Sequence, residues 1–362
     1  MKVDLIAGAR PNFMKIAPLI KAMQQRQKEG KNIFFRLVHT GQHYDKNMSD
    51  HFFEQLGIPD PDVNLGAGGG TQAEQTARIM IGYEKLLAET PTDLCLVVGD
   101  VTSTMACSIV AKKQQTKVAH VEAGIRSGDI TMPEEVNRIV TDSLTDYFFT
   151  TTEKANDNLR RLGVSADKIF FVGNTMIDTL LYQRPFFKAP SLWNDLNLSK
   201  GKYLVMTLHR PANVDEESQL QNLMKAIIDN AHGLPLIFPV HPRTKKMLDG
   251  IMLDAPNLYM TEPLGYLEFN YLVENAKAVI TDSGGITEET TVMGVPCMTL
   301  RNSTERPETV TEGTNELLGT DPSAIKPALE KLFKGEWKKG RIPEKWDGKT
   351  ASRIVDILVS LE

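Results

Sequence analysis

Acidic side chains follow two strand-like runs in the first half of the chain, and a third acid opens a helical pattern. Asp100 comes shortly after the apolar run 94–98, Glu122 comes directly after the run 117–121, and Glu134 lies at the start of a helical stretch. A carboxylate at the end of a strand either caps the next helix or serves as a general acid or base. The helix dipole explains Glu134 without any function, but it does not explain Glu122. We treat all three acids as candidate catalytic residues.

Basic side chains occupy comparable positions in both halves. Arg10 follows the first strand-like run, and Lys15 lies about one helical turn further on. A guanidinium and an ammonium beside a helix N-terminus make an anion site, although two solvated charges on a surface helix give the same pattern. In the second half, strands run into His209-Arg210 and His241-Pro242-Arg243, and Arg306 follows a further strand. These groups predict that the second half binds an anion.

A glycine turn strengthens that prediction. Ser283-Gly284-Gly285 opens a helix after an apolar run, and Glu289 lies about one turn further along it. Free backbone N–H groups in such a turn suit a phosphate, and an acid placed there can accept from ribose hydroxyls. By itself the turn is weak evidence. Acids in one half and anion-binding groups in the other together suit chemistry on a sugar attached to a nucleoside diphosphate.

Short apolar runs alternate with amphipathic stretches along both halves of the chain. Such alternation predicts parallel sheets with helices on both faces, so we expect an α/β fold with two doubly wound, Rossmann-like domains facing a cleft. We place the first domain at 1–175 and the second at 176–349. The segment 183–201, with two prolines and poor periodicity, is typical of a linker. Ligands of open parallel sheets bind at the carboxyl ends of the strands, where the candidate residues lie.

Composition excludes several classes of protein. The 362 residues include 41 Lys and Arg against 46 Asp and Glu, so we expect no bulk electrostatic affinity for nucleic acid or an anionic membrane. The three cysteines lie in apolar or helical stretches, which indicates buried thiols and a cytoplasmic location. No Cys–His cluster has zinc-site spacing, and no apolar run approaches the roughly 18 residues of a membrane span.

These residues stand in motifs that resemble the non-hydrolysing UDP-N-acetylglucosamine 2-epimerases, a family with the two-domain glycosyltransferase-B fold. The motifs follow one another in a single order from Gly8 to about Glu308, which makes the resemblance specific. They are Gly8-Ala-Arg-Pro, Lys15-Ile-Ala-Pro, Thr40-Gly-Gln-His, Gly99-Asp100, His120-Val-Glu-Ala-Gly, Pro133-Glu-Glu with Asn137-Arg138, Gly173-Asn-Thr, His209-Arg210, His241-Pro242, Asp282-Ser-Gly-Gly and Thr304-Glu-Arg-Pro-Glu.

Carried over position by position, the resemblance implies two sets of site residues. The catalytic set is Asp100, Glu122, Glu134 and His209. The substrate-binding set is Arg10, Lys15, Phe269 (near the uracil), Ser283, Gly284, Gly285, Glu289 and Arg306, and it also takes in Asp100, Glu122 and His209. The resemblance further implies a homodimer and a final helix, 350–362, that crosses back to complete the first domain.

Some positions depart from the best-known bacterial members of the family. This chain has Asn12 where they have Glu, Thr287 where they have Gln, and Leu264 in place of an amide that contacts substrate. The stretch between Glu122 and Glu134 is also shorter, as it is in relatives that act on UDP-2,3-diacetamido-2,3-dideoxyglucuronic acid. That sugar nucleotide therefore stays open as an alternative substrate.

The chemistry implied by the resemblance agrees with the residues. The C2 proton of an N-acetylhexosamine is not acidic, because no ring carbonyl is adjacent. Anti elimination of that proton and the anomeric UDP gives 2-acetamidoglucal, and UDP then adds back while a proton arrives on the other face of C2. This route needs acid and base groups on both faces and a cationic diphosphate site, but no metal or redox cofactor. Which acid serves which face stays open.

Two other classes of protein would share the nucleotide site. A glycosyltransferase of the same fold would need an acceptor groove and would not need three acids at these strand ends. A non-catalytic sugar-nucleotide sensor gives no reason for the acids. We therefore predict an isomerase that interconverts UDP-GlcNAc and UDP-ManNAc, a product that usually enters surface polysaccharides in this family.

Overall fold

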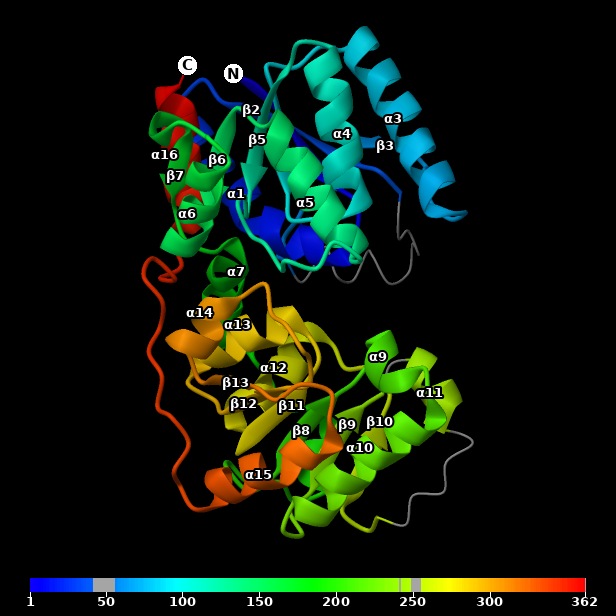
Figure 1. The fold of residues 1–362 in the computed structure, drawn as a ribbon. Helices are drawn as coiled ribbons and strands as arrows, with labels where there is room; N and C mark the ends of the chain where they lie inside the picture. Colours follow the sequence, from blue (N-terminus) through cyan, green and yellow to red (C-terminus); the bar gives the residue numbers. More distant parts are fainter. Residues whose placement is uncertain (42–55, 241, 249–254, 362) are drawn as a thin grey trace. The chain divides into compact units, whose positions relative to one another are not determined.

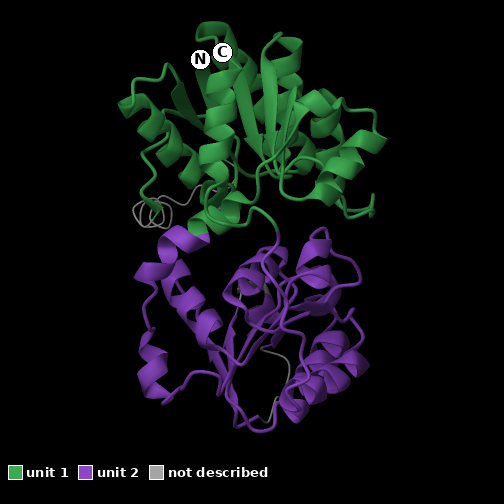
Figure 2. Ribbon diagram, turned by 90° about the vertical axis from the view of Figure 1, so that its left-hand side faces the viewer, with its two compact units in different colours: residues 1–179, 344–362 green, residues 180–343 purple. Residues whose placement is uncertain are grey.

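The computed structural model describes residues 1–41, 56–240, 242–248 and 255–361 (Figure 1). The chain forms two compact units (Figure 2). Unit 1 is Met1–Thr179 with Glu344–Glu362, and unit 2 is Leu180–Pro343. Unit 1 is therefore built from both ends of the chain. Within the described ranges, no helix combines the length and the apolar character that crossing a membrane requires.

Unit 1 contains a seven-stranded parallel sheet in the order β3-β2-β1-β4-β5-β6-β7. Its strands are β1 Lys2–Ala7, β2 Phe34–His39, β3 Val63–Asn64, β4 Leu94–Val98, β5 Lys117–Val121, β6 Tyr147–Thr150 and β7 Ile169–Phe171. Strand β4 is buried at every position, as expected for a central parallel strand covered on both faces.

Helices cover both faces of this sheet (Figure 1). Unit 1 includes α1 Arg10–Lys28, α3 Gln72–Glu89, α4 Thr102–Lys113, α5 Pro133–Leu144, α6 Glu153–Arg161, η1 Ala166–Lys168 and α16 Thr350–Ser360, and α7 Thr175–Gln183 begins in it. Helices α3, α4 and α5 pack side by side, while α1 packs against α16. Helix α3 begins with Thr71 and Glu74, which bond each other's backbone N–H groups as a capping box.

The C-terminal helix α16 is fixed to unit 1 by specific polar contacts. Asp178, on α7, accepts the backbone N–H groups of Thr350 at 3.1 Å and Ala351 at 2.7 Å. Arg26, on α1, donates to Asp356 at 2.6 Å. These bonds satisfy the first amides of α16 and hold the end of the chain beside its beginning.

Unit 2 contains a six-stranded parallel sheet in the order β10-β9-β8-β11-β12-β13. Its strands are β8 Leu204–Thr207, β9 Leu236–Pro239, β10 Leu258–Thr261, β11 Ala278–Thr281, β12 Cys297–Thr299 and β13 Asn315–Leu317. Its helices are η2 Arg184–Phe186, α8 Ser191–Asp195, α9 Pro211–Val214, α10 Glu217–Asn230, α11 Pro242–Leu248, α12 Tyr266–Asn275, α13 Gly284–Met293, α14 Pro307–Thr311, η3 Pro322–Ala324 and α15 Ile325–Phe333.

The expectation of a linker at 183–201 is wrong. This segment contains η2 and α8 and belongs to unit 2. Trp193 meets the rings of Tyr203 and Tyr271 edge-on, with centroids 5.8 and 5.1 Å away. Aromatic burial thus outweighs the poor periodicity and the prolines that suggested a linker.

The two sheets share one topological feature that positions polar residues. The strand order reverses between β1 and β4 in unit 1, and between β8 and β11 in unit 2. At such a switch point the connections leave toward opposite faces and open a crevice at the carboxyl ends of the strands. The candidate residues must therefore be sought after β1, β4 and β5, and after β8 and β11.

Candidate functional site

The turn between β1 and α1 is organised by Asn12. Its Oδ1 accepts the backbone N–H groups of Gly8 and Ala9, both at 3.1 Å, and its Nδ2 donates to the carbonyl of Val98 at 3.0 Å. The side chain is buried and joins the end of β1 to the end of β4. Since this bridge needs a donor as well as an acceptor, a glutamate could not replace Asn12 in it.

Glu122 lies at the end of β5 in a buried ion pair. Its Oε2 is 2.7 Å from Lys15 Nζ, and the two side chains are only 2% and 12% exposed. The backbone of Glu122 has φ 71°, in the left-handed region that non-glycine residues seldom adopt. Backbone strain of this kind, on the order of 1–3 kcal/mol, is found where a side chain has to be aimed at a functional site.

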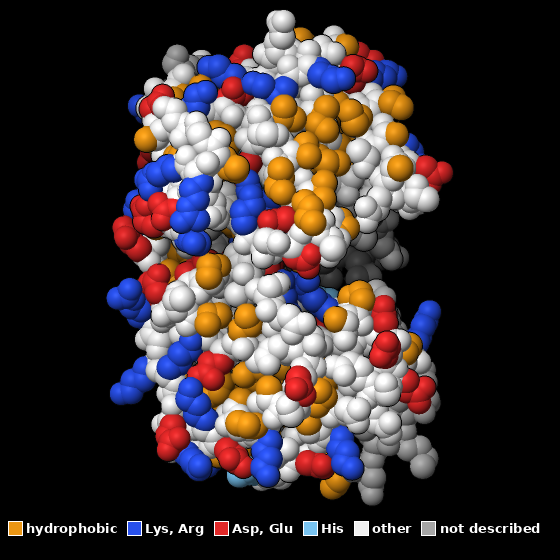
Figure 3. Space-filling view, viewed as in Figure 1, with side chains coloured by type: hydrophobic (Ala, Val, Ile, Leu, Met, Phe, Trp, Pro, Cys, Tyr) orange, Lys and Arg blue, Asp and Glu red, His pale blue; other side chains and the backbone are white. Residues whose placement is uncertain are grey.

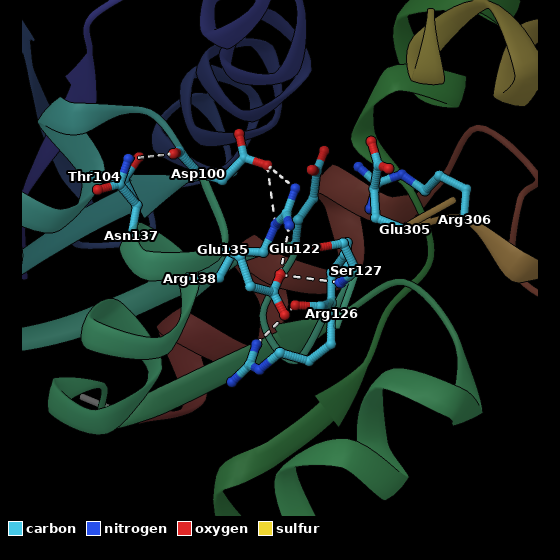
Figure 4. A network of polar contacts seen from close by, with 12 residues as sticks. Asp100, Thr104, Glu122, Arg126, Ser127, Glu135, Asn137, Arg138, Glu305 and Arg306 are labelled. Atoms are coloured by element: carbon cyan, nitrogen blue, oxygen red, sulfur yellow. Dashed lines mark hydrogen bonds and ion pairs between the residues drawn. The ribbon is translucent and has the colours of Figure 1, made fainter. Parts of the chain in front are cut away.

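Asp100 follows β4 and is bound by helix α5 (Figure 4). Arg138 donates to Asp100 Oδ2 from Nε at 3.1 Å and from Nη2 at 2.5 Å. Asn137 Nδ2 donates to the backbone carbonyl of Asp100 at 2.8 Å. The N-cap of α4 is Val101 and carries no side-chain cap, so the alternative role of Asp100 as a helix cap is excluded.

The two glutamates that open α5 differ in their surroundings. Glu134 is exposed in the first turn, whereas Glu135 is buried. Glu135 accepts from Arg138 at 2.7 Å and from the backbone N–H groups of Ser127 and Gly128 at 3.0 and 3.1 Å. Burial acts to raise the pKa of Glu135, but these donors outweigh it and hold the pKa below its ordinary value. Glu135 is thus committed to structure, and Glu134 is the acid that a ligand can reach.

A buried histidine supports the same strand ends. His120, on β5, places Nε2 2.8 Å from the carbonyl of Gly99 and Nδ1 2.7 Å from Asp142 Oδ1. Arg126 Nη1 lies 2.6 Å from the other oxygen of Asp142. Burial acts to raise the pKa of Asp142, but His120 and Arg126 outweigh it and lower that pKa. The network fixes the backbone that leads into Asp100.

In unit 2, Asp282 holds His209 in one orientation. His209 Nδ1 is 2.7 Å from Asp282 Oδ1, and the histidine side chain is 44% exposed while the aspartate is buried. Asp282 Oδ2 also accepts from the backbone N–H groups of His209 and Arg210 and from Asn213 Nδ2. Burial acts to raise the pKa of Asp282, but these donors outweigh it and lower the pKa. Nδ1–H therefore points at the carboxylate, and Nε2 faces away from it.

The turn Ser283-Gly284-Gly285 begins helix α13 after β11. A Cβ at Gly284 would come within 2.8 Å of Glu305 Oε1, whereas a Cβ at Gly285 would meet no atom within 4 Å. Packing within the chain accounts for the first glycine but not for the second. Open space over the N-terminus of a helix fits a ligand that approaches the backbone.

Glu289, one turn further along α13, is buried against the hydroxyl of Tyr266. The Tyr266 Oη–Glu289 Oε1 distance is 2.8 Å. Burial raises the pKa of the Glu289 carboxyl to about 7, and the hydroxyl only partly offsets this. Phe269, from the same helix as Tyr266, packs with Leu264 on the unit 2 core. Leu264, which stands where the best-known bacterial members have an amide, therefore contributes packing.

Arg306 is nearly buried in unit 2. Its Nε lies 2.5 Å from Glu288 Oε1, and its side chain is 8% exposed. The neighbouring Glu305 is paired with Arg301 at 2.6 Å. Burial acts to raise the pKa of Glu305, but Arg301 outweighs it and lowers the pKa to about 2. Both arginines beside the α13 turn are thus held by carboxylates of the chain itself.

Comparison with known proteins shows the family to which the chain belongs. A family model described as UDP-N-acetylglucosamine 2-epimerase matches residues 25–359. A UDP-N-acetylglucosamine 2-epimerase of Methanocaldococcus jannaschii is 40% identical over 377 residues, covering 99% of each chain. The chain belongs to the UDP-N-acetylglucosamine 2-epimerase family. The prediction of this family, and of an isomerase, is confirmed.

A solved structure of this M. jannaschii relative and one further relative bear on the fold and specificity of the chain. The crystal structure of the M. jannaschii enzyme in complex with UDP-GlcNAc and UDP matches with a TM-score of 0.86 at 40% identity, covering 99% of this chain and 100% of that one. A UDP-2,3-diacetamido-2,3-dideoxy-D-glucuronate 2-epimerase of Pseudomonas aeruginosa is 38% identical over 366 residues, covering 100% of each chain. With the two parallel sheets, the structural match confirms the predicted doubly wound α/β fold.

Most candidate residues of this epimerase chain lie in the described parts of the structure. In unit 1, Lys15 and Glu122 lie close to Gly99, the residue before Asp100, where an added Cβ would lie 3.2 Å from Lys15 Nζ and 3.8 Å from Glu122 Oε2. Arg10 begins α1, but its side chain lies outside the described parts, as do His241 and the side chain of Arg243. In unit 2 the described candidates are His209, Phe269, Ser283, Gly284, Gly285, Glu289 and Arg306.

Sequence reasoning missed the partners of the candidate residues. Arg138, Asp282 and Tyr266 bind Asp100, His209 and Glu289, respectively. Arg138 and Asp282 stand inside the quoted motifs, so each offered a signal that was given no role. Tyr266 had no signal, because its partner lies 23 residues away on another helix.

Proposed function

We propose that this protein is a non-hydrolysing 2-epimerase that interconverts UDP-GlcNAc and UDP-ManNAc. The observation that carries the proposal is the pair of carboxylates at neighbouring strand ends of unit 1. Glu122 and Asp100 follow β5 and β4, and each is held by a basic side chain from a different helix, Lys15 or Arg138. Two oriented carboxylates suit a reaction that moves a proton off one face of C2 and onto the other.

The proposed roles divide between the units. In unit 1, Asp100, Glu122 and Glu134 are the acid and base groups, and Arg10 and Lys15 contact the substrate. In unit 2, the open backbone at Gly285 and the neighbouring Ser283 and Gly284 take the diphosphate, Glu289 the ribose, and Phe269 lies near the uracil. His209 is the fourth catalytic residue, and Arg306 stabilises the leaving UDP. The M. jannaschii relative, whose crystal structure holds UDP-GlcNAc and UDP, supports this substrate.

The proposed route follows from the low acidity of the C2 proton. The C2 proton and the anomeric UDP leave in an anti elimination, which forms the C1–C2 double bond of 2-acetamidoglucal. UDP adds back to C1, and a proton arrives on the other face of C2. The leaving group is anionic, so cationic and backbone N–H groups around it stabilise the elimination more than the ground state. No cofactor enters these steps.

Solvent isotope incorporation tests the proposal directly. The protein is incubated in D₂O with UDP-GlcNAc as the only substrate, and C2 is followed by NMR. We expect deuterium at C2 of both epimers and the appearance of UDP-ManNAc without any acceptor. Retention of the C2 proton would contradict the proposal, as would release of UDP only when an acceptor sugar is added.

The P. aeruginosa relative gives the alternative substrate a specific basis. Its identity to this chain, 38%, is close to the 40% of the M. jannaschii enzyme. The isotope experiment is therefore run in parallel with UDP-2,3-diacetamido-2,3-dideoxyglucuronic acid. Faster exchange at C2 of that sugar would reassign the substrate while leaving the reaction unchanged.

We also place the enzyme in the cytoplasm as a homodimer. The three cysteines are buried free thiols, which suits a reducing compartment. Hydrophobic side chains gather over α4 and α5 on unit 1 (Figure 3). Val136 and Ile139 on α5 and Ile81 on α3 are 40%, 41% and 68% exposed. Exposed apolar side chains of this kind suit contact with a second copy.

Light scattering tests the dimer. We expect twice the monomer mass for the native chain, and the monomer mass when Val136 and Ile139 are both changed to lysine. Ile342→Lys, at an exposed apolar residue of unit 2, is the matched control and should leave the mass doubled. A native chain with the monomer mass would contradict the dimer.

A further inference from the structure

Asp100 receives two kinds of contact from helix α5, one on its backbone and one on its carboxylate. Asn137 binds the backbone carbonyl of Asp100, while Arg138 binds only its side chain, through Oδ2. The contact from Asn137 already ties the loop after β4 to α5. The two N–H donors of Arg138 both bind Oδ2 and fix the direction of the carboxylate.

Arg138 is itself held rigidly. Its Nη1 donates to Glu135, and Glu135 is anchored by two backbone N–H groups of the loop before α5. The Arg138 side chain is only 4% exposed, whereas that of Asp100 is 29% exposed. A buried, anchored guanidinium thus presents a partly exposed carboxylate, and Oδ1 stays outside the ion pair. Figure 4 shows Arg138 between the two acids.

We propose that Arg138 is a positioning residue for Asp100 in the epimerisation. It clamps Oδ2 so that Oδ1 is presented to the C2 proton in one orientation. The proposal rests on the proposed function, because it assigns Asp100 to proton transfer. Since Glu134 lies on the same helix as Arg138, α5 sets the placement of two of the three candidate acids.

The paired N–H geometry distinguishes this role from simple charge neutralisation. A lysine at position 138 keeps the positive charge but offers one flexible ammonium in place of a planar fork. An Arg138→Lys variant would therefore keep the charge near Asp100 and lose its orientation. A misplacement of about 1 Å in a reacting group lowers the rate by about 10²-fold.

The test measures turnover and binding on the same variants. For Arg138→Lys and Arg138→Ala, we expect kcat for deuterium incorporation at C2 to fall by about 10²-fold. UDP affinity, which unit 2 provides, should stay unchanged. Added guanidinium chloride should restore part of the rate of Arg138→Ala, and sodium chloride of equal ionic strength should not. Arg160→Ala, which removes an arginine paired with exposed acids on α6, is the control and should behave as the native chain.

Each outcome separates this inference from the proposed function. Absence of C2 exchange in the native enzyme would overturn the proposed function and the inference with it. A native enzyme that exchanges, together with an Arg138→Lys variant at full rate, would overturn the positioning role alone. If Arg138→Ala does not fold, the Lys variant decides, with its melting temperature as the check on folding. The positioning role would also be rejected if the variants lost activity in parallel with stability and added guanidinium chloride did not restore the rate.

Discussion

Two candidate acids of unit 1 and the candidate acid of unit 2 are held in different ways. In unit 1, Glu122 and Asp100 each face a cation from another element. In unit 2, Glu289 faces the neutral hydroxyl of Tyr266, and burial raises its pKa to about 7. Acids that exchange protons with a substrate need a fixed orientation, whereas an acid that accepts from ribose hydroxyls needs only a hydrogen-bond geometry.

The contrast extends to the backbone. Unit 1 places a strained non-glycine residue, Glu122, where its side chain is needed. Unit 2 places Gly285 where no protein atom approaches. The strand ends of unit 1 thus orient side chains, whereas those of unit 2 expose backbone N–H groups. This is the division of labour expected when one unit performs the chemistry and the other binds the nucleotide.

The largest effect on turnover is expected from a change to Glu122, the strained strand-end residue of unit 1. Glu122→Gln keeps the shape of the side chain but removes the charge that faces Lys15. Loss of a general acid or base lowers turnover by roughly 10²–10⁴-fold, so we expect kcat to fall within that range while UDP affinity stays the same. The measurement is C2 exchange in D₂O together with calorimetric titration of UDP.

Glu153→Gln is the matched control for that change. Glu153 lies in the first turn of α6 and is 61% exposed, so its loss should leave both turnover and binding unaltered. If Glu122→Gln turned over normally, Glu122 would be reduced to a partner for Lys15. The strain at its backbone would then serve the fold alone.

The site of unit 1 shows where sequence reasoning succeeds. Apolar runs in the sequence mark six of its strands within one residue of their ends, because strands that are buried on both faces are apolar along most of their length. The two-residue strand β3 and the short β13 were missed, because neither Val63–Asn64 nor Asn315–Leu317 is a continuous apolar run. Glu122 could be singled out because an acid that ends an apolar strand has no structural reason to be there.

The partners could not be derived in the same way. Arg138 meets Asp100 across 38 positions, and Asp282 meets His209 across 73. Such pairs depend on how the strands are ordered in each sheet, which local patterns do not encode. The prediction of a linker at 183–201 failed for a related reason, because the ring contact between Trp193 and Tyr203 forms only in the tertiary structure.

The second prediction concerns the tautomer of His209. In Asp282→Asn, the three donors at Oδ2 select the amide oxygen for that side, so the amide nitrogen faces His209 Nδ1. The histidine proton must then move to Nε2, which reverses the ring's donor and acceptor. We expect turnover to fall by at least ~10²-fold, since a wrong tautomer disables an acid–base histidine.

Stability separates this effect from unfolding. The fold should lose only about 1–3 kcal/mol, the cost of weakening buried hydrogen bonds. A thermal melt of Asp282→Asn therefore accompanies the activity measurement, and NMR of the His209 ring nitrogens reports the tautomer. A native rate with the reversed tautomer would show that His209 acts through its position alone.

The third prediction compares the two glycines of the α13 turn. Gly285→Ala meets no protein atom, and alanine favours a helix over glycine by about 0.5–1 kcal/mol, so the protein should be as stable as before or slightly more so. The same methyl group would block a diphosphate approaching the backbone. We expect UDP affinity to fall by about tenfold, the equivalent of one charge-assisted hydrogen bond at ~1.4 kcal/mol.

Gly284→Ala is the informative partner variant. Its Cβ would press on Glu305, so this change should lower stability as well as UDP affinity. Calorimetric titration of UDP and thermal melts of both variants check the difference. Unaltered UDP affinity in Gly285→Ala would remove the diphosphate from this turn.

The smallest expected effect is a pH dependence that differs between the units. Burial raises the pKa of Glu308 in unit 2 to about 7 and that of Asp178 in unit 1 to about 6. A raised folded-state pKa means that the native state binds more protons than the unfolded state. The stability from Glu308 is therefore full below about pH 4.5 and is lost toward pH 7, and that from Asp178 is lost between about pH 4 and 6.

The native melting curve alone cannot isolate these groups, because burial lowers the pKa of His39 to about 4 and makes stability rise between pH 4 and 6.5. Differences between variants remove that contribution. We expect Glu308→Gln to flatten the decline in melting temperature up to pH 7, and Asp178→Asn to flatten it only up to pH 6. Each change should amount to a few degrees, since one pKa unit corresponds to about 1.4 kcal/mol. If the two variants changed the melting temperature over the same pH range, burial would act alike on both carboxyls. The contrast between the units would then hold only for the residues at the carboxyl ends of their strands.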